Sequence, residues 1–274
     1  MAGHAPPPPA SDLDWPALIT VAERAADAAR RETLAYFRGS GLGTENKSAT
    51  GFDPVTLADR AAERAIRAVI EAARPDDAIL GEEEAARPGT SGLTWVIDPI
   101  DGTRAFLSGT PTWGVLIALS DATGPRLGLI DQPYIGERFL GAPGLATLTG
   151  PMGARPMATR ETAALEDAVI FTTFPEVGSP EEGAAFHALA GQCRLTRYGM
   201  DCYAYGLLAA GQIDLVVEAG LQPYDICAPI AVIEAAGGIV TDWTGGPAHG
   251  GGRALAAANP AIHAQALAIL GQHA

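Results

Sequence analysis

Residues 95–106 read WVIDPIDGTRAF, a run of apolar, strand-forming residues that ends in two aspartates, Asp98 and Asp101. Carboxylates held close together repel and raise each other's pKa, so such a pair persists where a cation or a shared proton offsets the repulsion. Pro99 fixes its own φ and biases Asp98 towards an extended conformation, which stiffens the turn. The stretch therefore predicts a buried strand that ends at a candidate cation site.

Composition limits the classes of partner. The chain has 274 residues, is 47% hydrophobic and carries a net charge of -14. The acidity argues against a nucleic-acid partner or an anionic membrane surface, and it suits metal cations or a cationic substrate. No apolar run approaches the roughly 18 to 20 residues of a membrane span, so no membrane partner is expected. Three cysteines without metal spacing predict reduced thiols and a cytoplasmic protein.

Three segments are predicted along the chain. Residues 1–15 form a flexible, Pro-rich tail, residues 16–150 an N-terminal α+β domain with most of the candidate ligands, and residues 151–274 a C-terminal α/β domain that completes the site. Asp14 can cap a first helix that stops near Gly39. We expect the site to lie in the crease between the two domains.

Two patterns distinguish these domains. The apolar spacing predicts a helix over 56–74 with Asp59 in its exposed first turn, and residues 94–149 predict an antiparallel meander that no helix interrupts. After residue 160, strands and helices alternate, which is typical of an α/β unit. The expected order is strand 168–174, helix 180–191, strand 194–198, helix 202–211, strand 213–218, helix 226–238 and strand 239–243.

Oxygen ligands gather around the opening motif. The Ile100 carbonyl lies between Asp98 and Asp101, and Glu82 follows another short apolar run. Mg²⁺ prefers such oxygen ligands in near-octahedral geometry, and a carboxylate that bridges two ions suits in-line displacement at phosphorus. The motif therefore indicates a candidate site for hard cations such as Mg²⁺.

The residues after the aspartates offer phosphate and proton-transfer groups. Gly102 and Thr103 continue the turn in a way that can present backbone N–H groups to a phosphate oxygen. The Thr103 hydroxyl can pass on a proton of water if a base relieves it, and the position of Asp59 suggests that role.

Each signal also has a plain structural interpretation. By itself, D-G-T is more often an ordinary turn, and Glu82 to Glu84 reads as a solvated charge run. Asp225 reads first as a helix N-cap. Their joint occurrence is what favours a site.

The segments GEEE at 81–84, WVIDPIDGT at 95–103 and YDICAPIAVIEAAGG at 224–238 resemble the inositol monophosphatase superfamily of Mg²⁺-dependent, lithium-sensitive phosphatases. The resemblance covers nearly the whole chain after residue 15. Within the superfamily, four further segments look most like histidinol-phosphate phosphatases of the inositol-monophosphatase type, which act in histidine biosynthesis: 45–63, 101–119, 197–225 and 239–243.

The resemblance implies a layered α-β-α-β-α sandwich, usually a homodimer, that binds two or three Mg²⁺ ions. It implies direct hydrolysis without a phosphoenzyme, with phosphate held by Gly102 and Thr103. Asp59 and Thr103 match the pair that positions and deprotonates the attacking water, with Glu82 beside them. The implied ligands are Glu82, Asp98 and the Ile100 carbonyl for one ion, and Asp98, Asp101 and Asp225 for a second.

Three positions depart from the superfamily pattern without removing a ligand. Leu57 replaces a residue that is often acidic, Gln222 stands where lysine is usual, and TLTGP at 147–151 replaces a frequent FLNG. Gln222 bears on substrate choice, because that loop borders the leaving group in the superfamily.

L-Histidinol phosphate is the expected substrate. Its leaving group carries an ammonium, and Asp201 and Glu218 are suited to accept hydrogen bonds from it. Arg197 could bind phosphate or only pair with Asp201. Carboxylates also bind sugar hydroxyls, so inositol monophosphate and other small phosphomonoesters or bisphosphates stay as alternatives. A regulatory protein that binds partners is the alternative of another class.

Overall fold

The computed structural model describes residues 13–39, 45–46, 54–55 and 57–272. The Pro-rich tail up to residue 12 and most of the motif between residues 45 and 56 lie outside the described residues. Within the part of the chain that the structure describes, no helix is both long enough and apolar enough to cross a membrane.

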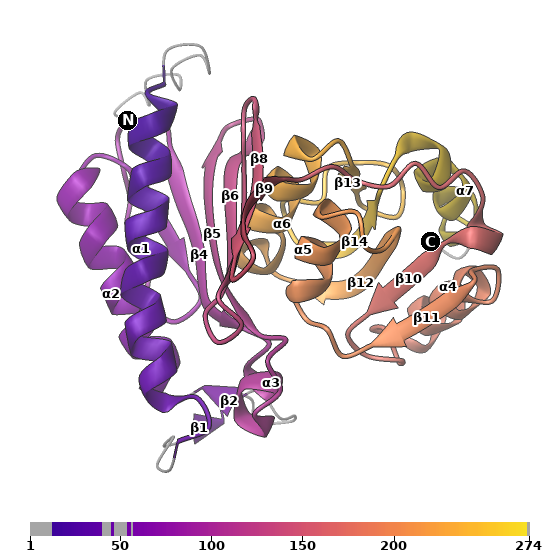
Figure 1. The fold of residues 1–274 in the computed structure, drawn as a ribbon, viewed down its shortest axis with the longest axis horizontal. Helices are drawn as coiled ribbons and strands as arrows, with labels where there is room; N and C mark the ends of the chain where they lie inside the picture. Colours follow the sequence, from indigo (N-terminus) through magenta and orange to yellow (C-terminus); the bar gives the residue numbers. More distant parts are fainter. Residues whose placement is uncertain (1–12, 40–44, 47–53, 56, 273–274) are drawn as a thin grey trace.

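Five alternating layers of helix and sheet build the molecule (Figure 1). One helix pair covers the outer face of a seven-stranded sheet, a second pair lies between this sheet and a five-stranded sheet, and a third pair covers the far face. This arrangement confirms the expected α-β-α-β-α sandwich. The pairs are α1 (Trp15–Tyr36) with α2 (Leu57–Ala73), α5 (Tyr203–Ala209) with α6 (Pro223–Ala235), and α4 (Pro180–Ala190) with α7 (Pro260–Leu270).

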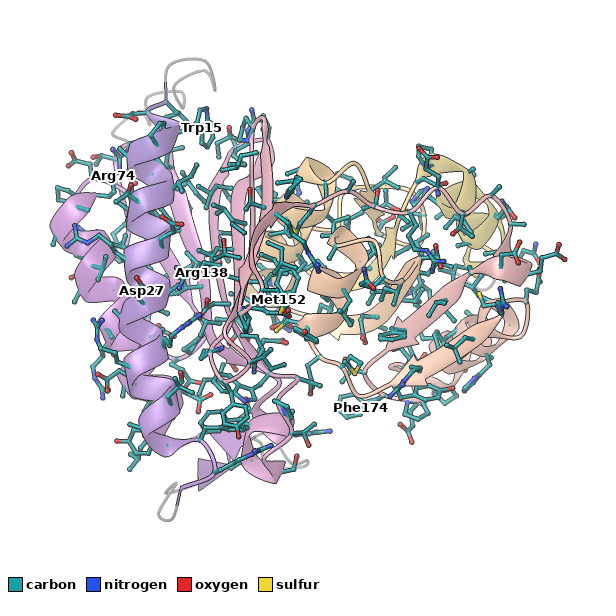
Figure 2. All side chains as sticks on the ribbon, in the orientation of Figure 1. Trp15, Asp27, Arg74, Arg138, Met152 and Phe174 are labelled. Atoms are coloured by element: carbon teal, nitrogen blue, oxygen red, sulfur yellow. The ribbon has the colours of Figure 1, made fainter. Side chains whose placement is uncertain are left out.

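Helix α1 begins where the sequence predicts. The Asp14 carboxylate accepts a hydrogen bond from the Ala17 backbone N–H at 3.2 Å, which satisfies one of the free donors of the first turn. Its buried face is rich in alanine, so α1 can lie close against α2. An ion pair of 2.7 Å between Asp27 and Arg138 ties the helix to strand β7 (Glu137–Ala142; Figure 2).

The first sheet has the strand order β3-β4-β5-β6-β7-β8-β9 and is antiparallel except for the parallel pair β3 and β4. It corrects the prediction in two ways. A short helix, α3 (Thr103–Ser108), interrupts the meander, and the sheet continues beyond residue 150. The strands are β3 (Ala78–Gly81), β4 (Thr94–Asp101), β5 (Gly114–Asp121), β6 (Gly124–Gln132), β7 (Glu137–Ala142), β8 (Leu145–Gly150) and β9 (Gly153–Pro156).

The second sheet has the order β11-β10-β12-β14-β13 and mixes parallel with antiparallel pairs. The expected alternation of strands and helices is present, but β14 and α7 follow it and were not predicted. A two-stranded ribbon and one 3₁₀ turn complete the description. The remaining elements are β10 (Val169–Thr172), β11 (Leu195–Tyr198), β12 (Leu215–Leu221), β13 (Ile239–Thr241), β14 (Gly252–Ala257), β1 (Glu45–Asn46), β2 (Pro54–Val55) and η2 (Leu165–Asp167).

The central helices join the two sheets through a shared core. Phe139 of the first sheet and Val216 of the second belong to one buried cluster with Ile226 and Val232 of α6. Burial of such side chains contributes roughly 1.5–3 kcal/mol each. Because the core is continuous, side chains from both halves meet at the N-terminal end of α6, where the candidate ligand Asp225 lies.

Candidate active site

An irregularity at the end of β4 allows the two aspartates of the opening motif to face one place. Asp98 pairs with Leu116 and Asp101 with Gly114, so β4 uses one more residue than its partner strand between these pairs. In a regular strand, residues three apart point to opposite faces, and the extra residue cancels that alternation. The Ile100 backbone N–H also donates to the Asp98 carboxylate at 3.0 Å.

A third carboxylate comes from α6. Asp225 lies in the first turn of this helix, and the Gln222 backbone N–H donates to it at 2.7 Å. The interpretation of Asp225 as the N-cap is therefore wrong: Gln222 is the N-cap, and Asp225 is the N3 residue that accepts from its backbone. Oxygen atoms of Asp98, Asp101 and Asp225 lie within 4.8 Å of one another. Such a set of hard oxygen donors fits the ligand preference of Mg²⁺.

The electrostatics of this cluster also favour a cation. Burial raises the pKa of Asp98 well above its usual range, and neighbouring carboxylates, Glu82 first among them, raise it further. Burial likewise raises the pKa of Asp101, with Asp225 as the main charged neighbour. The pKa of Asp225 rises to about 6 through burial, although the Gln222 backbone bond opposes the rise. A divalent cation would offset this repulsion.

Two further carboxylates, those of Glu82 and Asp59, lie near the cluster of Asp98, Asp101 and Asp225. Glu82 follows β3, and because β3 runs parallel to β4 with Gly81 paired to Ile97, both strands end on the same side. Asp59 lies in the first turn of α2, but only 1% of it is exposed, which corrects the prediction of an exposed first turn. Helix packing against the sheet turns Asp59 inward, and its charge contributes to the raised pKa of Asp98.

Gly102 and Thr103 form the turn into α3. Gly102 has a φ of 81°, a left-handed conformation that favours glycine, and a Cβ atom there would lie 2.8 Å from the Asp201 side chain. The Thr103 hydroxyl donates to the Ile100 carbonyl at 3.2 Å. This bond occupies the hydroxyl hydrogen in the present arrangement.

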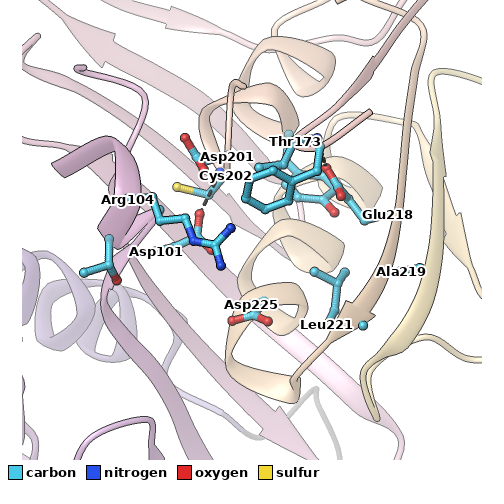
Figure 3. A pocket seen from close by; sticks show the side chains of 14 residues that line it. Asp101, Arg104, Thr173, Asp201, Cys202, Glu218, Ala219, Leu221 and Asp225 are labelled. Atoms are coloured by element: carbon cyan, nitrogen blue, oxygen red, sulfur yellow. Dashed lines mark hydrogen bonds between the residues drawn. The ribbon is translucent and has the colours of Figure 1, made fainter. Parts of the chain in front are cut away.

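A cavity of about 370 Å³ opens beside the carboxylates, between the two halves of the chain (Figure 3). Asp101 and Arg104 line it from the β4–α3 segment, and Glu218 lines it from β12. The position agrees with the expected crease. The full lining is Asp101, Gly102, Thr103, Arg104, Thr173, Phe174, Asp201, Cys202, Tyr205, Glu218, Ala219, Gly220, Leu221 and Asp225.

Asp201 lines the cavity beside the cluster of Asp98, Asp101 and Asp225. It adopts a left-handed conformation with a φ of 46°, which is uncommon for a residue other than glycine and marks a position held by its surroundings. The Thr112 hydroxyl donates to its carboxylate at 2.8 Å. The next backbone N–H, that of Cys202, donates to Asp101 at 2.7 Å. Asp201 is thus fixed next to a candidate metal ligand.

Glu218 of β12 is a buried carboxylate that lines the cavity. The Thr173 backbone N–H donates to one of its oxygens at 2.7 Å, and the Thr172 hydroxyl donates to the other at 3.2 Å. Burial nevertheless raises the pKa of Glu218 to about 7. A cationic group in the cavity would favour its ionised form.

The raised pKa of Glu218 predicts pH-dependent stability. A folded-state pKa of about 7 against the ordinary 4.5 means that its contribution is complete below about pH 4.5 and is lost as the pH rises through about 7. The loss should be on the order of 3 kcal/mol. In EDTA, we expect the Tm of the wild type to fall more steeply between pH 5 and 8 than that of Glu218→Gln. Parallel Tm curves for the two proteins, measured by calorimetry, would contradict this assignment.

Arg197 lies apart from the cavity. It is exposed on β11, the edge strand of the second sheet, and it is not among the lining residues. Its position therefore does not support the expected contact with phosphate. The neighbouring Asp201 reaches the cavity because the chain turns sharply between β11 and α5.

The cavity wall includes residues that the sequence did not single out as substrate contacts. The Arg104 guanidinium lies over the Phe174 ring at 4.9 Å and joins the two halves across the cavity. Tyr205 also lines it. Arg104 directly follows the D-G-T motif, which was a usable signal, whereas no local pattern distinguishes Phe174 or Tyr205 from packing residues.

Comparison with known proteins places this arrangement in a family. The inositol monophosphatase family profile matches residues 14–274. The chain belongs to the inositol monophosphatase family. An inositol monophosphatase from Zymomonas mobilis superimposes with a TM-score of 0.83 at 38% identity, covering 94% of this chain and 99% of that one. Membership in this family supports the conclusion that the protein is a metal-dependent phosphatase that acts on a small phosphomonoester.

The family relatives carry several names. The bifunctional phosphatase IMPL2 of Arabidopsis thaliana is 40% identical over 86% of this chain and 67% of its own length. A histidinol-phosphatase of Chlorobaculum parvum is 34% identical over 92% of this chain and 96% of its own. Others at 33% and 34% identity are named Nus factor SuhB and inositol-1-monophosphatase. Membership therefore establishes the chemistry more firmly than the substrate.

Proposed function

We propose that this protein hydrolyses L-histidinol phosphate to L-histidinol and phosphate in a Mg²⁺-dependent reaction. The observation that carries the proposal is the acidic wall of the cavity beyond the metal cluster, where Asp201 and Glu218 are both held by neighbouring donors. A leaving group with an ammonium fits two carboxylates there better than a neutral polyol does. The relatives named histidinol-phosphatase support the same substrate.

The carboxylate cluster would hold the metal. Glu82, Asp98 and the Ile100 carbonyl are the proposed ligands of one ion, and Asp98 shares a second with Asp101 and Asp225. Bound Mg²⁺ supplies Lewis-acid stabilisation of phosphate charge and lowers the pKa of a coordinated water. The raised pKa values of Asp98, Asp101 and Asp225 support this assignment, because burial first and neighbouring carboxylates second disfavour the ionised forms, and a bound cation would offset both effects.

The remaining residues would handle phosphate and protons. Gly102 and Thr103 lie at the cavity wall, and we assign them to the phosphate. The attacking water gives up its proton through the Thr103 hydroxyl to Asp59, its oxygen bonds to phosphorus, and the bond from phosphorus to the histidinol oxygen breaks. The leaving alkoxide takes up a proton from solvent water and Asp59 returns its proton to solvent, so the products are the free alcohol and inorganic phosphate and the base is regenerated.

Recognition of the leaving group would fall to the acidic wall. Asp201 accepts a hydrogen bond from Thr112, and Glu218 accepts from Thr172 and Thr173. Since a carboxylate has about four lone-pair sites, both keep acceptor sites for a substrate. An approaching ammonium would favour the ionised form of Glu218, whose pKa is about 7 without it. The pairing gives charge-assisted bonds at an enclosed position.

The test is a comparison of kcat/KM for L-histidinol phosphate and myo-inositol 1-phosphate with Mg²⁺. We expect histidinol phosphate to be preferred by at least about tenfold. Asp201→Asn and Glu218→Gln should each lower kcat/KM for it by roughly 10- to 100-fold, since a hydrogen bond to a charged group contributes about 1.5–3 kcal/mol. The inositol ester should lose less.

Glu181→Gln provides a matched control, because this glutamate of α4 is exposed and is not among the lining residues. It should leave both substrates unaffected. A preference for the inositol ester, or carboxamide variants that hydrolyse histidinol phosphate normally, would overturn the substrate assignment while leaving the phosphatase chemistry intact.

A regulatory role is the alternative of another class, favoured by the relatives named Nus factor SuhB. The net charge of -14 opposes direct RNA binding. A pull-down with RNA polymerase and with RNA distinguishes the two roles.

A homodimer is also proposed, and light scattering after size-exclusion chromatography would measure its mass.

A further inference from the structure

Helix α2 carries a second buried carboxylate, one turn after Asp59. Glu63 has no exposed surface, and residues four apart on a helix share a face. Its two oxygens accept hydrogen bonds from the backbone N–H groups of Glu83 at 2.8 Å and Glu84 at 3.0 Å. These donors directly follow Glu82, so Glu63 holds the segment that carries this proposed ligand.

A buried arginine, Arg67, joins Glu63 in holding this segment, and we call the pair the clamp. Arg67 donates to Glu63 from Nε at 2.8 Å and pairs with it through Nη2 at the same distance. Its Nη2 also donates to the Glu84 carbonyl at 3.1 Å. The pair therefore binds both a donor and an acceptor of the same backbone segment, and it is itself shielded from water, with 8% and 0% of the two side chains exposed.

The sequence makes room for this contact. Gly81 ends β3, and a Cβ atom built there would lie 2.2 Å from a Glu63 oxygen, closer than any real contact. Glycine thus lets the carboxylate approach the backbone just before Glu82. β3 lies at the edge of the first sheet, and the segment after it returns to the strand at Arg87, which exchanges two backbone hydrogen bonds with Ile79. The Glu63 contacts hold the part of this segment that directly follows Glu82.

We propose that Glu63 is a positioning residue that fixes Glu82 for metal binding and thereby sets the Mg²⁺ affinity. This inference rests on the proposed function, in which Glu82 is a ligand. Through it, one helix positions two parts of the site: its first turn carries Asp59, and its second turn holds the Glu82 segment. Conversion to an amide would weaken these contacts, because each oxygen accepts from a backbone N–H, Oε1 also accepts from Arg67, and an NH₂ group cannot accept from any of them.

The experiment measures Mg²⁺ binding to metal-free protein by calorimetric titration, and separately the Mg²⁺ concentration that gives half-maximal phosphate release. Groups that orient metal ligands typically contribute 10- to 100-fold to metal affinity. We expect Glu63→Gln to weaken Mg²⁺ binding by about that factor, while kcat at saturating Mg²⁺ falls much less. A purely structural residue would lower the Tm without this change in affinity.

Glu71→Gln is the matched control, because Glu71 lies on the same helix with an exposed carboxylate 3.9 Å from Arg87. It should bind Mg²⁺ as the wild type does. Glu63→Asp keeps the charge but shortens the side chain, and we expect its Mg²⁺ affinity to lie between those of the wild type and Glu63→Gln. If Glu63→Gln loses its native circular dichroism, the Mg²⁺ affinity of Glu63→Asp tests the positioning role instead.

The outcomes separate this inference from the function on which it rests. A wild type that binds Mg²⁺, together with folded Glu63 variants of unchanged affinity, would overturn the positioning role alone. A wild type that binds no Mg²⁺ would overturn the metal site and the positioning role together. Histidinol phosphate as the substrate is tested by neither result.

Discussion

Asp98→Asn is expected to lower kcat by at least about 10³-fold, and removal of Mg²⁺ with EDTA is expected to abolish turnover. Asp98 is only 2% exposed and lies among the charges of Glu82, Asp101 and Asp225, so it is the carboxylate placed to contact both proposed ions. Loss of its charge should misplace both ions and forfeit several kcal/mol of transition-state stabilisation. Initial rates of phosphate release over a Mg²⁺ titration provide the measurement.

Glu83→Gln is the control for this prediction. Glu83 adjoins Glu82 in sequence, and its backbone N–H bond to Glu63 does not depend on its side chain. The variant should keep most of the activity. Ca²⁺ should substitute poorly because its coordination is larger and looser. Full activity in excess EDTA, or equal losses in the two variants, would refute the ligand assignment.

The long elements follow from local sequence. A cap at Asp14 and a regular apolar stripe predict α1, and a similar stripe predicts α2. The strands of the meander are apolar enough to be recognised singly. The layered sandwich itself was predicted from the family resemblance, because neither periodicity nor composition states how the two sheets are arranged around α5 and α6.

The missed elements are short or weakly patterned. Helix α3 has six residues between two glycines in left-handed conformations, too few for a helical period to show. Strand β14 and helix α7 are rich in alanine, which marks neither a strand nor a helix face. Asn259 before Pro260 was a usable start signal, since its side chain accepts from the backbone of the first turn.

Some contacts of the candidate site could be predicted from the sequence, and others could not. Asp98 and Asp101 are adjacent in one motif, so their proximity could be predicted, whereas Thr112 bonds Asp201 across 89 positions in sequence. Arg197 precedes the segment that begins at Asp201, but only Asp201 of the two lines the cavity. The clamp at Glu63 depends on the packing of α2 beside β3, which sequence alone does not give.

Asp59→Asn is expected to lower kcat by roughly 10² to 10⁴, the range of general acid–base catalysis, while substrate affinity changes little. Asp59 is buried beside the metal cluster, and the amide would keep its size while removing its ability to accept the water proton. Stopped-time phosphate release at saturating and limiting substrate separates kcat from KM. Asp76→Asn, an exposed aspartate after α2, should behave as wild type.

Mg²⁺ affinity distinguishes a base from a ligand at this position. The charge of Asp59 already adds to the repulsion that raises the pKa of Asp98. If Asp59 acts only as the base, Asp59→Asn should bind Mg²⁺ within a few-fold of wild type, while kcat collapses. Thr103→Ser should keep the relay hydroxyl and most of the activity, and Thr103→Val should lose it. Normal kcat with a raised KM would reassign Asp59 to substrate binding, and a large loss of Mg²⁺ affinity would make it a metal ligand.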